Sequence, residues 1–124
     1  MFESEDVRAL VDLGFIAIGL GLDEAADRIF SGVRALRPDQ EAGYIGDALV
    51  RMTREDFNGA TKVLRPLPPT DSARLFLGMA LMRGGEREEA GRVLGDVARR
   101  AENPAMSVLA TSLIEGAATT RGAR

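Results

Sequence analysis

The sequence predicts an all-α protein built from three consecutive helical hairpins and a final helix. Three sets of residues recur along the chain, spaced first by 34 residues and then by 30. They are a small residue at Gly14, Ala48 and Gly78, an alanine at Ala26, Ala60 and Ala90, and a large apolar residue at Phe30, Leu64 and Leu94. Self-similarity at this period is typical of stacked helix pairs. No run of alternating β-branched residues is long enough to predict a strand.

The first hairpin is expected over residues about 7–40. Its first helix should run over about 6–20, with Ser4 as the capping residue and acidic side chains in the first turn. Glycines break this helix, and a second helix follows over about 23–36. Pro38 then closes the unit, because proline cannot continue a helix.

The second hairpin is expected over residues about 41–70. Its first helix should end near Met52, and its second helix should cover about 56–65. Prolines at 66, 68 and 69 cut this second helix short. The truncation accounts for the shorter spacing before the third hairpin.

The third hairpin is expected over residues about 71–103, with helices at 71–82 and 86–100. Asn103 and Pro104 are a capping residue and a first helical residue, so a last helix should begin there and end near 116. This helix is interpreted as a cap on the stack. The sequence thus predicts one domain over 1–116 and a disordered tail over 117–124.

Composition narrows the function. The chain has 124 residues, 45% hydrophobic and 28% charged, with a net charge of −3 and no basic stripe, so no nucleic-acid partner is predicted. It has no Cys and no His, which removes the commonest nucleophile, general base and metal ligands. We therefore predict no catalytic residue, no metal and no cofactor.

The longest apolar run, Gly14 to Leu22, is too short to cross a bilayer, and the acidic start is unlike a secretory signal. A cytoplasmic protein without membrane insertion is expected.

The pattern resembles the tetratricopeptide repeat (TPR). That family has a small residue in the first helix, a small residue in the second, a large apolar residue four positions later and a closing proline. The first unit matches with Gly14, Ala26, Phe30 and Pro38, and the likeness extends from about residue 7 to 102. The second unit departs, with Asp47 and Arg51 at usually apolar positions and Pro66 too early. The resemblance implies a short superhelical solenoid.

Three such repeats and a cap in a small acidic chain resemble the TPR chaperones of bacterial type III secretion. The segment from Leu36 to Leu67 is similar to the family of needle-subunit chaperones and related Hrp-type proteins. This likeness rests on pattern and size, not on a diagnostic motif. It implies a chaperone that binds an amphipathic helix of a small secreted subunit, such as a needle subunit, with a co-chaperone as a further partner.

The helical register predicts which side chains line the inner face of such a stack. Positions five, nine and twelve of each first helix are all apolar, and a tyrosine lies beside them. The residues are Val11, Phe15, Ile18, Tyr44, Ile45, Leu49, Met52, Leu75, Met79 and Met82. We call this set the inner stripe. An apolar groove suits the apolar face of a helix, and methionine adapts to varied surfaces.

Two other interpretations of the inner stripe remain open. The side chains can be ordinary core, with the inner helices packed on each other or on the last helix. They can also form a homodimer seam, in which case the chain is a scaffold module that associates with itself. An enzyme is the least supported class, since no acid–base pair or phosphate motif is present.

Overall fold

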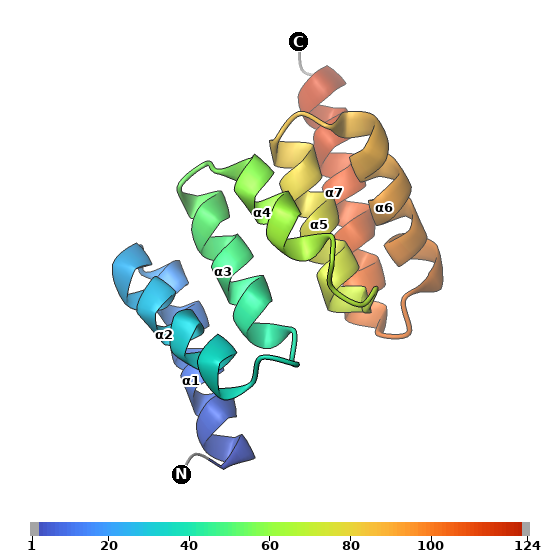
Figure 1. Ribbon diagram of the computed structural model, residues 1–124. Coiled ribbons are helices and arrows are strands. Elements are labelled where there is room, and N and C mark those ends of the chain that lie inside the picture. Colours follow the sequence, from blue (N-terminus) through green and yellow to red (C-terminus); the bar gives the residue numbers. More distant parts are fainter. Residues whose placement is uncertain (1–2, 123–124) are drawn as a thin grey trace. The chain divides into compact units, whose positions relative to one another are not determined.

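The computed structural model describes residues 3–122 of the chain, and the side chains of residues 3–117. All regular structure in this range is helical, and no strand occurs in it (Figure 1). The helices are α1 (Ser4–Gly19), α2 (Asp23–Leu36), α3 (Ala42–Thr53), α4 (Phe57–Leu64), α5 (Asp71–Arg83), α6 (Arg87–Arg100) and α7 (Pro104–Gly122). The predicted all-α class is confirmed.

Local capping chemistry sets the start of several helices. The Asp56 carboxylate accepts a hydrogen bond from the Gly59 N–H at 3.0 Å, and α4 begins directly after it. The Thr70 hydroxyl accepts from the Ala73 N–H at 3.1 Å ahead of α5. The Asn103 side chain accepts from the Ala105 N–H at 2.9 Å, as the sequence predicts for the last helix. Each cap satisfies a backbone donor that has no partner inside its helix.

The two ends of the chain differ from the prediction. Ser4 does not cap α1, because it is already the first residue of that helix. The capping residue is Glu3, whose backbone N–H donates to the Asp6 carboxylate at 3.1 Å in a capping box. At the other end α7 continues to Gly122, past the expected end near 116. Residues 123–124 of the predicted tail lie outside the described range.

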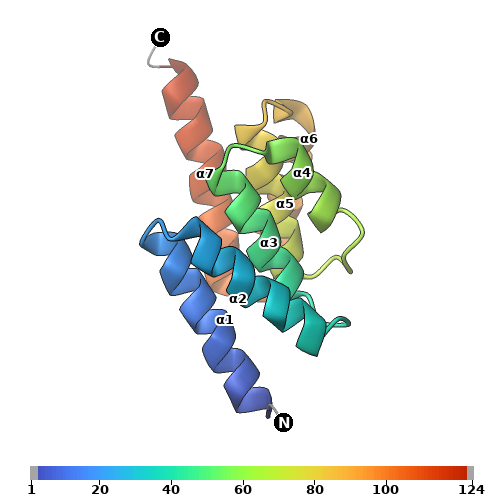
Figure 2. The same cartoon turned by 60° about the vertical axis from the view of Figure 1, so that its left-hand side comes forward.

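The helices group into two compact units, one up to Pro66 and one from Leu67. In unit 1, α2 packs against both α1 and α3, α1 also contacts α3, and α4 packs on α3 (Figure 2). In unit 2, α6 packs against both α5 and α7, and α5 also contacts α7. The boundary lies in the proline-rich segment that shortens the second hairpin.

Phe30 of α2 is the centre of the core in unit 1, where it is completely buried. Two glycines on neighbouring helices make room for its ring. A Cβ atom at Gly14 of α1 would lie 2.5 Å from the Phe30 Cζ, and one at Gly46 of α3 would overlap the ring more closely. The ring of Phe15 meets Phe30 edge-on, with centroids 5.2 Å apart. The aromatic ring is thus held between α1 and α3.

The same relation recurs in unit 2. A Cβ atom at Gly78 of α5 would overlap the side chain of Leu94, which is completely buried on α6. Gly78 and Leu94 occupy the repeat positions of Gly14 and Phe30. In both hairpins the small residue of the first helix therefore faces the large residue of the second, and this close approach is the physical reason for the repeated pattern.

Candidate functional site

The inner stripe begins on α1 with side chains that remain partly accessible. Val11 and Ile18 are half-buried and pack against the Phe30 core, while Phe15 keeps 37% of its surface exposed. Val11 also lines a depression of about 370 Å³ between α1 and the segment that leads into α3. Its walls are Ser4, Val7, Arg8 and Val11 on one side and Arg37, Gln40 and Ala42 on the other. This end of the stripe combines two valine side chains with two arginines.

On α3 the stripe is divided between accessible and buried residues. Tyr44 and Leu49 are half-buried. The Tyr44 hydroxyl donates to the Pro38 carbonyl at 2.8 Å, and the Arg34 guanidinium lies 5.9 Å from the centre of its ring. Ile45 is only 4% exposed and Met52 1%, so both are core. The accessible members of the stripe in unit 1 are Val11, Phe15, Ile18, Tyr44 and Leu49.

In unit 2 the last helix covers the stripe. Leu75 is 2% exposed, and Met79 and Met82 are half-buried. All three belong to one apolar cluster with residues of α6 and α7, including Met106, Leu113 and Ile114 of α7. This part of the stripe therefore follows the interpretation that the inner helices pack on the last helix. The sequence left that alternative open because it does not specify where α7 docks.

Asp47 and Arg51, the two polar departures in the second hairpin, join helices of unit 1. Asp47 is 6% exposed, and its carboxylate accepts from Arg34 Nη1 of α2 at 3.0 Å and from Arg51 Nε at 3.2 Å. Arg51 also pairs with Asp56 at 3.2 Å. The Asp47 carboxylate, with the help of Asp56, raises the pKa of Arg51 above its ordinary value. The buried acid is thereby a bridge between α2 and α3.

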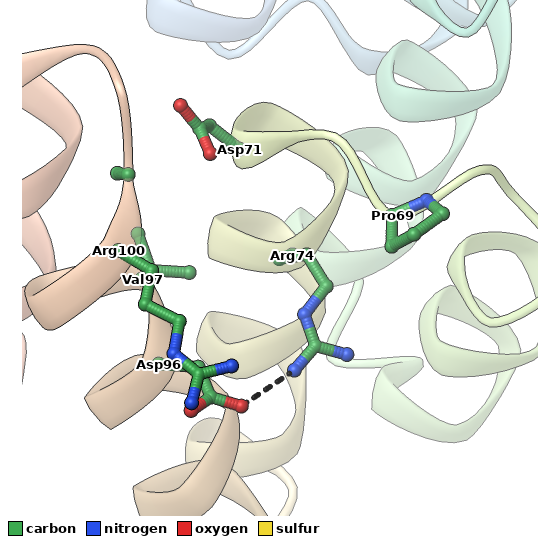
Figure 3. A pocket seen from close by; sticks show the side chains of 7 residues that line it. Pro69, Asp71, Arg74, Asp96, Val97 and Arg100 are labelled. Atoms are coloured by element: carbon green, nitrogen blue, oxygen red, sulfur yellow. Dashed lines mark hydrogen bonds and ion pairs between the residues drawn. The ribbon is translucent and has the colours of Figure 1, made fainter.

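Unit 2 has a second depression, of about 300 Å³, which is polar (Figure 3). Its lining residues are Pro69, Asp71, Arg74, Asp96, Val97, Arg100 and Ala101. Its acids are used within the chain. Asp96 accepts from Arg74 at 3.3 Å, and the Asp71 carboxylate accepts from the backbone N–H groups of Glu102 and Asn103 at 3.0 and 3.4 Å. These bonds tie the start of α5 to the end of α6 and the start of α7.

The structure also exposes an apolar face that the sequence analysis missed. Leu13, Ile16 and Leu20 of α1 are 53%, 57% and 69% exposed. Their spacing of three and four places them on one side of the helix, opposite Val11 and Ile18. The signal in the sequence is that Leu13 and Ile16 stand at the positions that Asp47 and Val50 occupy in the second hairpin.

No group of three or more carboxylate side chains is placed to hold a metal ion within the described range. No helix in the described range has the length and hydropathy needed to cross a membrane.

Comparison with known protein families, with curated proteins and with solved structures finds no match for this chain.

Proposed function

We propose that this chain is a TPR-type protein-binding module that acts as a chaperone in bacterial type III secretion. The observation that carries the proposal is the accessible part of the inner stripe in unit 1. Five apolar or aromatic side chains on the contacting helices α1 and α3 lie partly open, and one of them, Val11, also lines a depression. The link to type III secretion rests on the resemblance of the repeats to the small TPR chaperones of that system.

In this proposal the partner is an amphipathic helix. Its apolar side would contact Val11, Phe15, Ile18 and Leu49, and the affinity would come from apolar area removed from water, about 25 cal/mol per Å². Phe15 is the best anchor, because its ring is the most exposed of the five and already rests on Phe30. Arg8 at the rim of the depression would orient an acidic residue of the helix.

The chaperone role follows from what such binding hides. A small secreted subunit that polymerises through an apolar helix would stay monomeric while this helix is held on unit 1. A needle subunit bound with a co-chaperone is the partner that the family likeness favours. The chemistry is reversible burial, so the proposal requires neither nucleotide nor metal.

Co-production tests the proposal. The chain is produced together with the needle subunit of its own secretion system, and the soluble fraction and the complex are measured by size-exclusion chromatography. We expect the subunit to be soluble only with the chaperone, and Phe15→Asp to abolish the complex. Val108→Asp, which changes an exposed apolar residue of α7, is the matched control and should bind normally. A subunit that is equally soluble alone contradicts the proposal.

Self-association through the same stripe is the second candidate, since the same exposed ring of Phe15 would suit a copy of the chain. It predicts a dimer in sedimentation that Phe15→Asp dissociates and that the secreted subunit does not. A monomer at all concentrations would exclude it.

A further inference from the structure

The packing of α2 on α3 defines a buried helix face in unit 1. Four residues of α3 form it: Gly43, Gly46, Asp47 and Val50, and all four are buried. A Cβ atom at Gly43 would meet Arg34, and one at Gly46 would overlap Phe30. The carboxylate of Asp47 pairs with Arg34. Val50 lies in the cluster around Phe30.

The positions on α1 that are equivalent to this face lie 34 residues earlier, which is the repeat spacing. The corresponding residues are Ala9, Asp12, Leu13 and Ile16, and all four are exposed. Leu20, 69% exposed, extends the same side by one turn. We call these five residues the outer face of α1. Within unit 1, α1 contacts α2 and α3 through its other sides, and none of the described helices of unit 1 occupies on α1 the place that α2 occupies on α3.

The outer face is not built like the end of a stack. Terminal repeats usually present a polar surface, because an apolar end is costly in water. Here the three largest side chains are leucine or isoleucine and each is more than half exposed. Contiguous apolar surface of this kind marks a binding site.

We propose that the outer face of α1 binds an amphipathic helix of a second protein, which packs on α1 as α2 packs on α3. Two differences between the faces define the chemistry of that helix. Leu13 replaces Asp47, so the helix carries an apolar residue where α2 has Arg34. Asp12 replaces Gly46, so a carboxylate occupies the space of the Phe30 ring, and the helix carries a flexible basic residue there.

Charge supports this assignment. The Asp12 side chain is exposed, and among the described residues no hydrogen bond or ion pair engages its carboxylate. A lysine on the bound helix would lay its carbon chain over the leucine-rich surface and bring its ammonium group to that acid. Ala9 in place of Gly43 sets the helix slightly further out than α2 lies on α3.

The described part of this chain offers no helix of its own for the role. The apolar side of α2 is already buried between α1 and α3. Among the described side chains, the large apolar residues exposed away from α1 and the turn after it are Val108 and Leu109, two neighbours on α7. The outer face of a second copy carries no basic residue that could meet Asp12, so the occupant assigned here is a helix of a different protein. The outer face lies opposite Val11 and Ile18 on α1, so this inference does not rest on the proposed use of the inner stripe.

Two synthetic helices test the proposal by fluorescence anisotropy against the full chain. Both have the sequence of residues 22–36, stapled between positions 24 and 28, which are exposed in α2. The matched probe carries Phe30→Lys and Arg34→Leu, whereas the reference probe keeps the native residues at both positions. We expect the matched probe to bind at least ten times more tightly than the reference probe.

Variants of the chain supply the controls. Ile16→Asp should weaken binding of the matched probe at least tenfold, and Val108→Asp should leave it unchanged. The double variant Asp12→Gly with Leu13→Asp recreates the face of α3, so it should reverse the preference between the two probes. No saturable binding of the matched probe, or no effect of Ile16→Asp, overturns the proposal. A wild-type dimer that Ile16→Asp dissociates also overturns it, since the occupant would then be a second copy.

Discussion

Arg34 Nη1 of α2 donates to Asp47 Oδ2 of α3 across 3.0 Å, and this bond links the first hairpin to the second. The acid is nearly buried, with 8% of its side chain exposed, whereas 34% of the Arg34 side chain is exposed. A buried carboxylate is tolerated only when donors surround it, and Arg51 supplies a second one. The link between the hairpins therefore depends on charge as well as on apolar packing.

Removing Arg34 should destabilise unit 1. In Arg34→Met the Asp47 carboxylate keeps Arg51 but loses its closest donor, and we expect the free energy of unfolding to fall by about 1–3 kcal/mol. Urea unfolding followed by circular dichroism measures it. Arg99→Met, which breaks the exposed pair with Asp96, is the comparison and should change stability by less than about 1 kcal/mol. Equal effects of the two variants would mean that the Arg34–Asp47 bond contributes no more to stability than an exposed ion pair.

Gly46 should not tolerate even one added methyl group. In an open helix Gly→Ala stabilises by about 1 kcal/mol, but at Gly46 the new atom would overlap the buried Phe30 ring. We expect Gly46→Ala to lower the thermal midpoint, with a cost of about 1–3 kcal/mol.

Gly91 provides the matched control for this substitution. It lies inside α6, and apart from its chain neighbours and the backbone of its own helix no atom lies within 4 Å of the place that a Cβ would occupy. Gly91→Ala should therefore raise the midpoint. A rise with Gly46→Ala as well would show that α2 and α3 do not approach as closely as described.

Met79→Asp distinguishes core from groove in unit 2. Met79 packs in the cluster that α7 covers, so the new carboxylate would lie partly buried without a partner. We expect the helical signal to melt at a clearly lower temperature than in the wild type. Met79→Leu, which nearly conserves volume, should cost less than about 1.5 kcal/mol. Wild-type melting of Met79→Asp would place this residue on an accessible surface.

The hydroxyl of Thr70, which caps α5, should contribute measurably to the free energy of unfolding. The Thr70 hydroxyl accepts from the Ala73 N–H, and Thr70→Ala leaves that donor to water, at a cost of about 1 kcal/mol. Thr70→Ser keeps the hydroxyl and should recover most of the loss in chemical denaturation. If the serine and alanine variants are equally unstable, the contribution of Thr70 comes from its methyl group instead.

The boundaries of the hairpins were predictable because their causes are local. Asn103 and Pro104 predict the start of α7, which begins at Pro104. The prolines that follow Arg65 predict the end of the second hairpin, whose last helix ends at Leu64. The prediction that Ser4 caps α1 was wrong by one position, because Glu3 is the capping residue. Cap residues one position apart cannot be distinguished by type alone.

Contacts between helices were harder to predict from the sequence. Asp47 looked misplaced because its partner Arg34 lies on another helix, and no spacing rule links the two. The accessibility of Met79 and Met82 depends on where α7 docks, which the sequence pattern does not contain. The outer face of α1 is equally hard to predict, because the sequence pattern does not show which helix covers each apolar position.

The division of the chain at Pro66 has a consequence for biosynthesis. The core cluster around Phe30 is built from residues of unit 1 alone. Because domains generally fold as units, beginning with the N-terminal one, during synthesis at about 5–20 residues per second, α1 to α4 can assemble while the ribosome is still adding α5 to α7. The nascent chain would then present a folded unit 1 before unit 2 is complete.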